Sequence, residues 1–250
     1  MKKGKRHNQI GLDRLVRLEW LETATRLIMS GSEASEVGAV LREELKGAFR
    51  SSNPSVRGSL DKTITIVMKT WVRPIPELVP LREDGLKLLA SLPSRCHAAV
   101  HWGMIMAAYP FWGVVAAYVG RLLALQEVIS SGQVQRRVRE QYGERETAAR
   151  RARYVLRSFI DWGVLQDGLR AGEYKQGHVL SIDNLELVVW LIEALLHFSP
   201  EGSVTFREVL TFPGLFPFRI HRMPSGQELA SSGRIEVVRH GLDDTILYLK

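Results

Sequence analysis

The residue types best suited to metal chemistry lie together at Cys96, His97 and His101, in the pattern CHxxxH. If this segment is helical, Cys96 or His97 could share a face with His101 and hold a zinc ion. A closed zinc site needs further ligands, however, and the sequence offers no second cluster of cysteine and histidine. We therefore interpret these histidines as packed side chains, and we expect no metal site and no cofactor.

Residues that could carry out catalysis lack a suitable setting. Asp243 and Asp244 fall in a predicted hairpin turn, where aspartate is favoured because it accepts hydrogen bonds from its own backbone. The sequence has no glycine-rich loop followed by Lys-Ser or Lys-Thr for nucleotide phosphates, and it has no GxSxG motif. The sequence therefore predicts a protein that is not an enzyme.

The strongest chemical signal is a run of arginines in GERETAARRARYVLRSFIDWGVL, residues 143–165. On a helical wheel the apolar side chains form one stripe, which comprises Ala148, Ala152, Val155, Leu156, Phe159 and Ile160. The opposite side carries Thr147, Arg150, Arg151, Arg153, Tyr154 and Arg157. No acidic residue lies between Ala148 and Ile160, although a purely solvated face usually mixes both signs of charge. Guanidinium groups suit phosphates and guanine edges, so this pattern favours a helix that binds nucleic acid.

The surrounding segments predict a winged helix-turn-helix domain over residues 109–183. A helix over residues 110–130 and a shorter one in SSGQVQRRVREQYG come first, and the turn GERET contains a threonine that could cap the next helix. Two alternating runs follow, near residues 163–167 and 177–182, and a glycine-rich, charged loop joins them as a hairpin. In such a domain the last helix enters the major groove of DNA and the hairpin, or wing, contacts the backbone.

We therefore expect the helix 147–161 to lie in the groove of double-stranded DNA, with basic residues around it on phosphates. The wing would contribute Arg170, Lys175 and His178. The segments before the helix would contribute Arg136, Arg137, Arg139 and Arg145. The same helix and hairpin could instead belong to a protein–protein module, since this fold also serves as a dimerisation scaffold.

The overall composition agrees with an anionic partner. The chain of 250 residues has a net charge of +7, and its 45% hydrophobic content is enough to bury a large core. A single cysteine excludes an intramolecular disulfide framework and favours a reducing cytoplasm. The start MKKGKRHNQIGLDRL is charged but lacks the apolar core of a signal peptide, so we expect a flexible basic arm over residues 1–9.

Residues 10–108 are expected to form an all-helical N-terminal domain. Apolar spacing predicts a helix over residues 10–30, and GSEASE offers a serine cap for the helix AVLREELKGAF. KTITIVMKTW could be a strand, but its apolar residues also line one helical face, so we prefer a helix over residues 59–72 that ends at RPIPELVP. Further helices are expected over residues 81–90 and 95–108.

The most apolar segment, residues 98–120, is long enough to suggest a membrane span. His101 lies within this segment, Pro110 divides it, and much of it is alanine and glycine, which insert weakly into a bilayer. We expect two adjacent buried helices, the second beginning at Pro110, and no membrane association.

Residues 184–250 repeat the plan and predict a second, winged-helix-like unit. NLELVVWLIEALLHF is an apolar helix, SVTFREVL a short second helix with Ser203 as its cap, and PSGQELASSG a third. A hairpin would close the unit, with Ile235 and Val237 alternating on one strand and Ile246 and Tyr248 on the other. The third helix has no cluster of arginines, so we expect this unit to support the structure or contact a partner. The fold class is thus mainly α, with a helical N-terminal domain, a winged helix-turn-helix and a second, α+β unit.

Three segments resemble the BrxA family, whose members are small components of the BREX phage-defence systems. The segments are KTITIVMKTWVRPIPEL, YPFWGVVAAYVGRLL and ERETAARRARYVLRSFIDWGVLQDG. The resemblance implies a non-enzymatic protein that binds double-stranded DNA beside larger methyltransferase and ATPase partners. BrxA-like proteins are often shorter, so the C-terminal part of this chain could be arranged differently.

The main hypothesis from the sequence is therefore a cytoplasmic accessory DNA-binding protein of a defence system. The alternatives are a winged-helix transcriptional regulator, an adaptor whose basic face binds an acidic protein, and a protein associated with membranes through residues 98–120. Salt dependence distinguishes DNA from the other partners, because affinity for DNA falls steeply as salt rises when phosphates have been neutralised.

Overall fold

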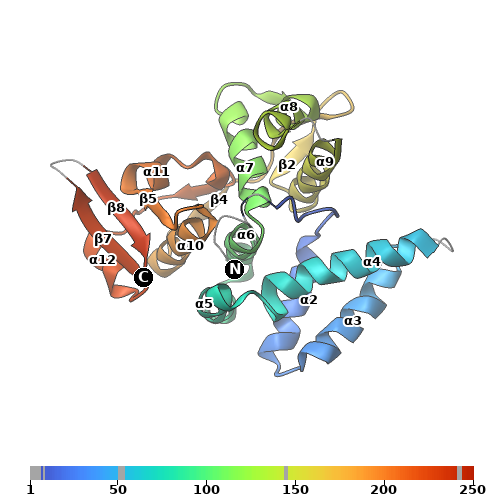
Figure 1. The fold of residues 1–250 in the computed structure, drawn as a ribbon, viewed down its shortest axis with the longest axis horizontal. Coiled ribbons are helices and arrows are strands. Elements are labelled where there is room, and N and C mark those ends of the chain that lie inside the picture. Colours follow the sequence, from blue (N-terminus) through green and yellow to red (C-terminus); the bar gives the residue numbers. More distant parts are fainter. Residues whose placement is uncertain (1–6, 8, 50–53, 144–145, 241–243) are drawn as a thin grey trace.

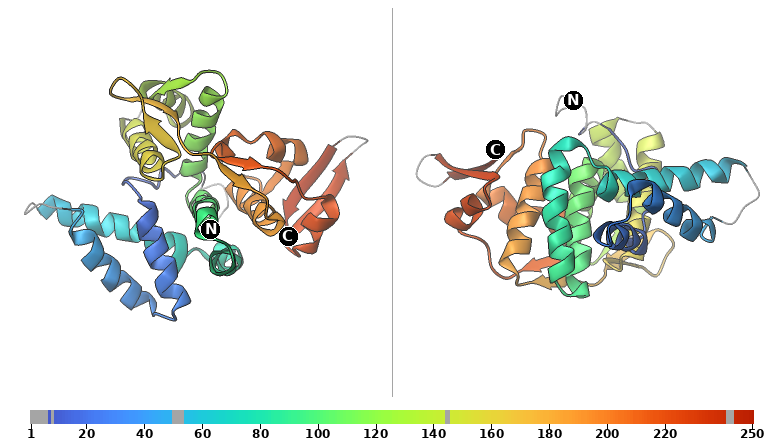
Figure 2. Two further views of the ribbon diagram at one scale, coloured as in Figure 1. Left: turned by 180° about the vertical axis from the view of Figure 1, so that it is seen from behind. Right: turned by 90° about the horizontal axis from the view of Figure 1, so that it is seen from below.

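The computed structural model describes residues 7, 9–49, 54–143, 146–240 and 244–250. Within these ranges the protein is mainly helical, with small sheets, as the sequence predicts (Figure 1). Helix α6, His97–Ala108, lies at the centre, and three groups of elements surround it (Figures 1 and 2). Residues 99–107 of this helix are buried.

The first group is all-helical. Its elements are α2 (Leu18–Met29), α3 (Ala34–Lys46), α4 (Pro54–Val67), the π-helical turn η1 (Met68–Val72), the 3₁₀ turns η2 (Pro76–Leu78) and η3 (Ser94–Cys96), and α5 (Val79–Ser91). The helix preferred for residues 59–72 is confirmed, and so are the helices expected near residues 81–90 and 95–108.

Two expectations for the first group are wrong. The helix predicted for residues 10–30 begins only at Leu18. The segment before it is not helical, because its backbone forms a hydrogen bond to the Ser158 side chain and the side chains of Leu12 and Val16 are buried in the core. The cap of α3 is Glu33 rather than a serine, and the backbone N–H of Glu33 donates to the Glu36 carboxylate at 3.0 Å. The predicted arm over residues 1–9 falls largely outside the described residues.

Helices α6 and α7 meet at a sharp corner. Helix α7, Pro110–Leu123, begins at Pro110 as predicted, and the two helices are bent by 118°. Both are largely buried in the core of the protein, so the prediction of two adjacent buried helices is confirmed. Among the described helices, none is by itself long and apolar enough to cross a membrane. Helix α7 is shorter than the predicted 110–130, because residues 128–130 pair as a strand.

The second group combines helices with a three-stranded antiparallel sheet. It contains α7, β1 (Val128–Ser130), α8 (Ser131–Tyr142), α9 (Glu146–Asp161), β2 (Leu165–Asp167) and β3 (Glu173–Gln176). The strand order is β1-β3-β2. The hairpin after α9 is confirmed, but its second strand is Glu173–Gln176 and not residues 177–182. Only Tyr174 is buried on this strand. Because the other residues are polar or charged, the strand has the sequence pattern of a loop.

The third group repeats this succession. It contains α10 (Leu185–Phe198), β5 (Ser203–Thr205), α11 (Phe206–Thr211), the 3₁₀ turn η4 (Pro213–Leu215), β6 (Phe218–Ile220), α12 (Gly226–Ser231), β7 (Ile235–His240) and β8 (Asp244–Leu249). The sheet order is β5-β8-β7, which matches the order in the second group. Strand β4 (Leu180–Ile182), which the sequence placed in the earlier hairpin, pairs in parallel with β6.

Two details of this group differ from the sequence prediction. Ser203 lies on β5, and the cap of α11 is Thr205, whose hydroxyl accepts from the backbone of Glu208 at 3.1 Å. Val237 pairs with Leu247, so β8 turns Leu247 to the core rather than Ile246 and Tyr248. The predicted turn of this hairpin covers residues 241–244; Asp243 lies outside the described residues, whereas Asp244 is the first residue of β8 and pairs with His240.

An aromatic cluster joins the central helix α6 to the second and third groups. The indole of Trp102 on α6 stacks on Phe159 of α9, with 4.8 Å between ring centroids. The same indole meets Phe216 and Phe218 of the third group edge-on, and its N–H donates to the Gly214 carbonyl at 3.1 Å. The buried core is therefore continuous from the first group to the last.

Candidate nucleic-acid interface

Helix α9 presents three of its arginines to solvent in one line. The predicted core stripe is confirmed, since all its members are buried except Ile160, which is half-buried. On the other side Arg150, Arg153 and Arg157 are exposed and lie within about 60° of one another around the helix axis. None of the three has a carboxylate partner among the described residues. We call these residues the arginine row.

The flank between the core and the arginine row is covered by residues 9–17, which we call the strap. The Ser158 hydroxyl accepts from the backbone N–H of Val16 at 2.9 Å, and the Trp162 indole donates to the Val16 carbonyl at 2.9 Å. At the end of the helix, the backbone N–H of Leu18 donates to the Asp161 carboxylate at 3.3 Å. Burial raises the pKa of Asp161, although this hydrogen bond opposes the effect. The strap therefore fixes one side of α9 along much of its length.

The strap also removes two predicted residues from the exposed face. The Arg151 guanidinium donates to the Ile10 carbonyl, and the Arg14 guanidinium lies 6.0 Å from the centre of the Tyr154 ring. Both Arg151 and Tyr154 are half-buried. Both side chains therefore make contacts within the protein, and their predicted role in DNA binding stays a prediction.

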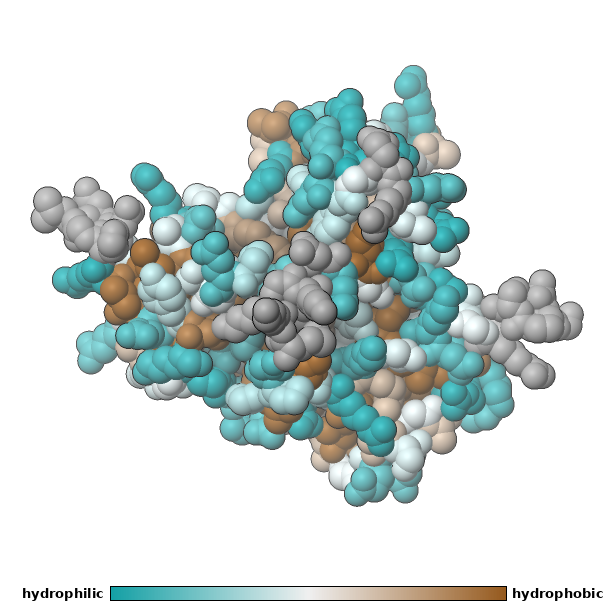
Figure 3. Space-filling model, viewed as in Figure 1, coloured by the Kyte–Doolittle hydropathy of each residue, from teal (hydrophilic) through white to brown (hydrophobic). Residues whose placement is uncertain are grey.

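Helix α8 contributes further positive charge beside α9. Arg136 and Arg137 are exposed, and Arg139 is half-buried. Arg137 is 3.0 Å from the Glu140 carboxylate, so its charge is partly neutralised. Figure 3 shows that hydrophilic side chains cover most of this group on the face in view.

The remaining predicted residues have different positions. Arg170, in the loop between β2 and β3, and Lys175, on β3, are both exposed. His178 follows the hairpin and is exposed at its base, where its backbone N–H donates to the Gly163 carbonyl at 2.8 Å. Thr147 is exposed inside the first turn of α9 and is not its cap, because the helix begins at Glu146. Arg145 lies outside the described residues.

The histidines of the CHxxxH pattern both contact Glu22 of α2. The Glu22 carboxylate lies 3.1 Å from Nδ1 of His97 and 3.3 Å from Nε2 of His101. Burial lowers the pKa of His101, whose ring is fully buried and meets Trp71 edge-on. Burial by itself would raise the pKa of Glu22, but the two imidazoles lower it. Among the described residues, no group of three or more such side chains is placed to hold a metal ion.

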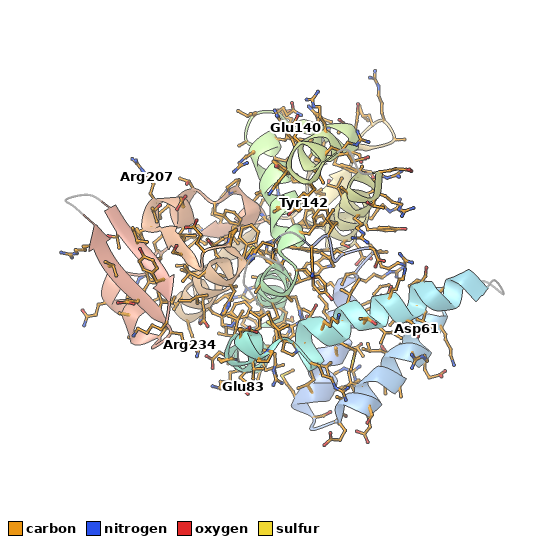
Figure 4. All side chains as sticks on the ribbon, viewed as in Figure 1. Asp61, Glu83, Glu140, Tyr142, Arg207 and Arg234 are labelled. Atoms are coloured by element: carbon orange, nitrogen blue, oxygen red, sulfur yellow. The ribbon has the colours of Figure 1, made fainter. Side chains whose placement is uncertain are left out.

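A partly buried ion pair in the third group was not predicted from the sequence. The Arg234 guanidinium donates to both oxygens of Glu193, at 2.7 and 2.9 Å, and it reaches Asp84 of α5 at 2.5 Å. The side chain of Glu193 is only 2% exposed. Figure 4 shows Arg234 between the third group and α5, near Glu83. The ion pair borders a cavity of about 470 Å³, whose apolar lining is formed by Ile75, Pro76, Pro80, Leu196 and Leu249.

Comparisons with known proteins identify no family for this chain. No family model matches the sequence, and no curated protein or solved structure shows detectable similarity to it. The resemblance of three segments to the BrxA family therefore stays a prediction.

Proposed function

We propose that this protein binds double-stranded DNA and that its second group acts as a winged helix-turn-helix domain. The arginine row is the observation that carries the proposal. Three guanidinium groups that have no anionic partner within the described part of the chain lie on α9, which follows α8 and precedes the β2–β3 hairpin. In this arrangement α9 is the helix that enters the major groove, and the hairpin is the wing.

The dimensions of the arginine row fit a DNA groove. At a rise of roughly 1.5 Å per residue, Arg150 and Arg157 are about 10 Å apart along the helix axis. A major groove about 12 Å wide admits such a helix, and arginine binds both phosphates and the acceptor edge of guanine. Arg136 on α8 and Arg170 on the wing would then neutralise phosphates on either side of the groove.

The third group has no comparable surface on its corresponding helix. The exposed residues of α12 are uncharged, namely Gly226, Gln227, Ala230 and Ser231. We therefore assign DNA binding to the second group.

The resemblance to the BrxA family supports a biological setting for this function. We propose that the protein is a non-enzymatic accessory component of a BREX-type defence system, with a methyltransferase and an ATPase as partners. Genes for both proteins beside its own, and their co-purification with it, are the expected observations.

The test of DNA binding is the triple variant Arg150→Ala, Arg153→Ala, Arg157→Ala. Fluorescence anisotropy with a labelled duplex, repeated at several salt concentrations, measures both affinity and its salt dependence. Each lost phosphate contact should reduce the slope of log affinity against log salt by about 0.9, so three lost contacts should reduce it by roughly 2.7.

A matched control removes the same charge from the third group. Arg207, Arg219 and Arg239 are exposed there, and their replacement by alanine should leave the salt slope unchanged. If the arginine-row variant instead binds duplex DNA as tightly as the parent, with an unchanged slope, α9 does not bind DNA. The adaptor with an acidic protein partner then becomes the better account.

A further inference from the structure

The tip of the β2–β3 hairpin presents an apolar side chain to solvent. Leu169 is 96% exposed, the largest value among the exposed large hydrophobic residues of the described chain. Single exposed apolar residues are ordinary on protein surfaces. Leu169 differs because hydrogen bonds within the loop hold the backbone in a conformation that leaves this side chain exposed.

Three hydrogen bonds fix the loop from within. The backbone N–H of Gly168 donates to the Glu173 carbonyl at 2.7 Å, and the N–H of Glu173 donates to the Arg170 carbonyl at 3.0 Å. The N–H of Arg170 donates to the Glu173 carboxylate at 3.3 Å. A side chain at Gly168 would approach Cβ of Glu173 to 2.8 Å, so this tight path requires glycine. Leu169 is therefore presented outward by an ordered turn.

The loop is also tied to the helix before α9. Gly172 has a φ of +80°, which glycine adopts easily, and its carbonyl accepts from the N–H of Ser131, the first residue of α8, at 2.8 Å. Figures 1 and 2 show the loop projecting on the same outer side of this group as α9. A duplex bound along the arginine row would therefore meet the tip of the hairpin.

We propose that Leu169 enters the minor groove of the bound duplex and bends the DNA, an inference that rests on the proposed function. Minor-groove proteins insert leucine and similar side chains between base steps, which kinks the duplex by roughly 20–90°. Arg170 follows Leu169 in the sequence and is exposed, so its charge would lie on the phosphates next to the inserted side chain. Because pyrimidine–purine steps unstack easily, the protein should prefer duplexes with such a step under the wing.

Energy transfer between dyes at the two ends of a duplex of about thirty base pairs measures the bend when the protein is in excess over the DNA. A bend of the size expected for a wedge brings the two dyes closer together. The parent should raise the transfer efficiency, and Leu169→Ala should return it nearly to the value of free DNA. The salt slope of the variant should equal that of the parent, because leucine contacts no phosphate. Affinity should fall by about tenfold, which corresponds to 1.4 kcal/mol at 25 °C.

Two further variants make the result specific. Leu125→Ala removes another leucine, 84% exposed in the loop after α7, and should bend DNA like the parent. Leu169→Met keeps an apolar wedge and should keep most of the bend. If the parent binds the duplex without bending it, or if Leu169→Ala bends it equally, the proposed insertion of Leu169 is wrong. The proposal that the protein binds DNA is then unaffected. If the parent shows no salt-dependent binding to duplex, the proposed function fails first and the wedge fails with it.

Discussion

Replacing Phe159 by alanine tests whether the core holds α9 in the orientation that exposes the arginine row. Phe159 is fully buried and stacks on Trp102, and it meets Trp112 edge-on with 4.8 Å between ring centroids. Phe216 of the third group lies 5.9 Å away by the same measure. The substitution therefore removes a side chain that the central helix, α7 and the third group all contact.

The expected loss of stability follows from these contacts. Truncation of a buried phenylalanine costs about 3–5 kcal/mol in transfer and cavity energy. Each aromatic pair adds roughly 0.5–1.5 kcal/mol, so we expect a loss in the upper part of the range, about 4–5 kcal/mol. In a chain of this length the melting temperature should fall by roughly 8–20 °C. Urea denaturation followed by tryptophan fluorescence measures the change, since Trp102 and Trp112 report on the site.

A substitution on the opposite side of α9 provides the control. Arg153 is exposed, and its replacement by alanine should change the unfolding free energy by no more than about 0.5 kcal/mol. A loss of unfolding free energy below about 1 kcal/mol for Phe159→Ala would refute the orientation of α9, because truncation of a well-packed phenylalanine costs more than this.

Two further predictions concern buried charges. Arg234→Met should cost about 3 kcal/mol in chemical denaturation, because it leaves the buried carboxylate of Glu193 with only the His197 imidazole, at 3.9 Å, as a cationic partner. The double variant Arg234→Met, Glu193→Gln should recover part of the lost stability. If it recovers none, the ion pair between Glu193 and Arg234 does not explain the loss. Because burial lowers the pKa of His101 below its usual 6.5, the unfolded chain binds a proton that the folded chain resists, and stability falls as the pH drops below that value. His101→Leu should remove up to about 1.4 kcal/mol per pH unit of this dependence, and a variant whose pH profile matches the parent would refute the assignment.

The parts of the fold that were predictable from the sequence depend on local periodicity. The stripe on α9 repeats at the helical spacing, so the burial of Phe159 and the exposure of Arg150 both follow from the wheel. Pro110 indicates the start of α7, because proline is well suited to the first turn of a helix. These features need no knowledge of what the helices pack against.

Contacts between distant segments could not be predicted in this way. The apolar residues of the strap follow no regular spacing. Its hydrogen bond from the Val16 backbone to the Ser158 hydroxyl joins residues 142 positions apart in the sequence. Arg151 was expected to be exposed because the wheel cannot show that a backbone carbonyl of another segment covers it. Strand β3 was missed because pairing on both edges, and not its own apolar residues, stabilises it.

The ion pair between Glu193 and Arg234 could be predicted from the sequence only in part. Glu193 lies within the apolar helix LELVVWLIEALLHF, and a buried carboxylate needs a partner. The spacing identifies the acid but not the base, since Arg234 is 41 positions away along the chain. A charged residue inside an apolar helix therefore predicts that a partner exists without naming it.

We expect the arginine row to contribute little to the stability of the fold, and this is a further reason to propose a ligand for it. The core stripe and the strap already hold α9 on two sides. Like charges three and four residues apart destabilise a helix by roughly 0.2–0.5 kcal/mol per pair, and alanine has the highest helix propensity. The triple variant of Arg150, Arg153 and Arg157 should therefore melt at the same temperature as the parent or above it, while it loses affinity for DNA. That result would support our proposal that the arginine row binds a partner of opposite charge.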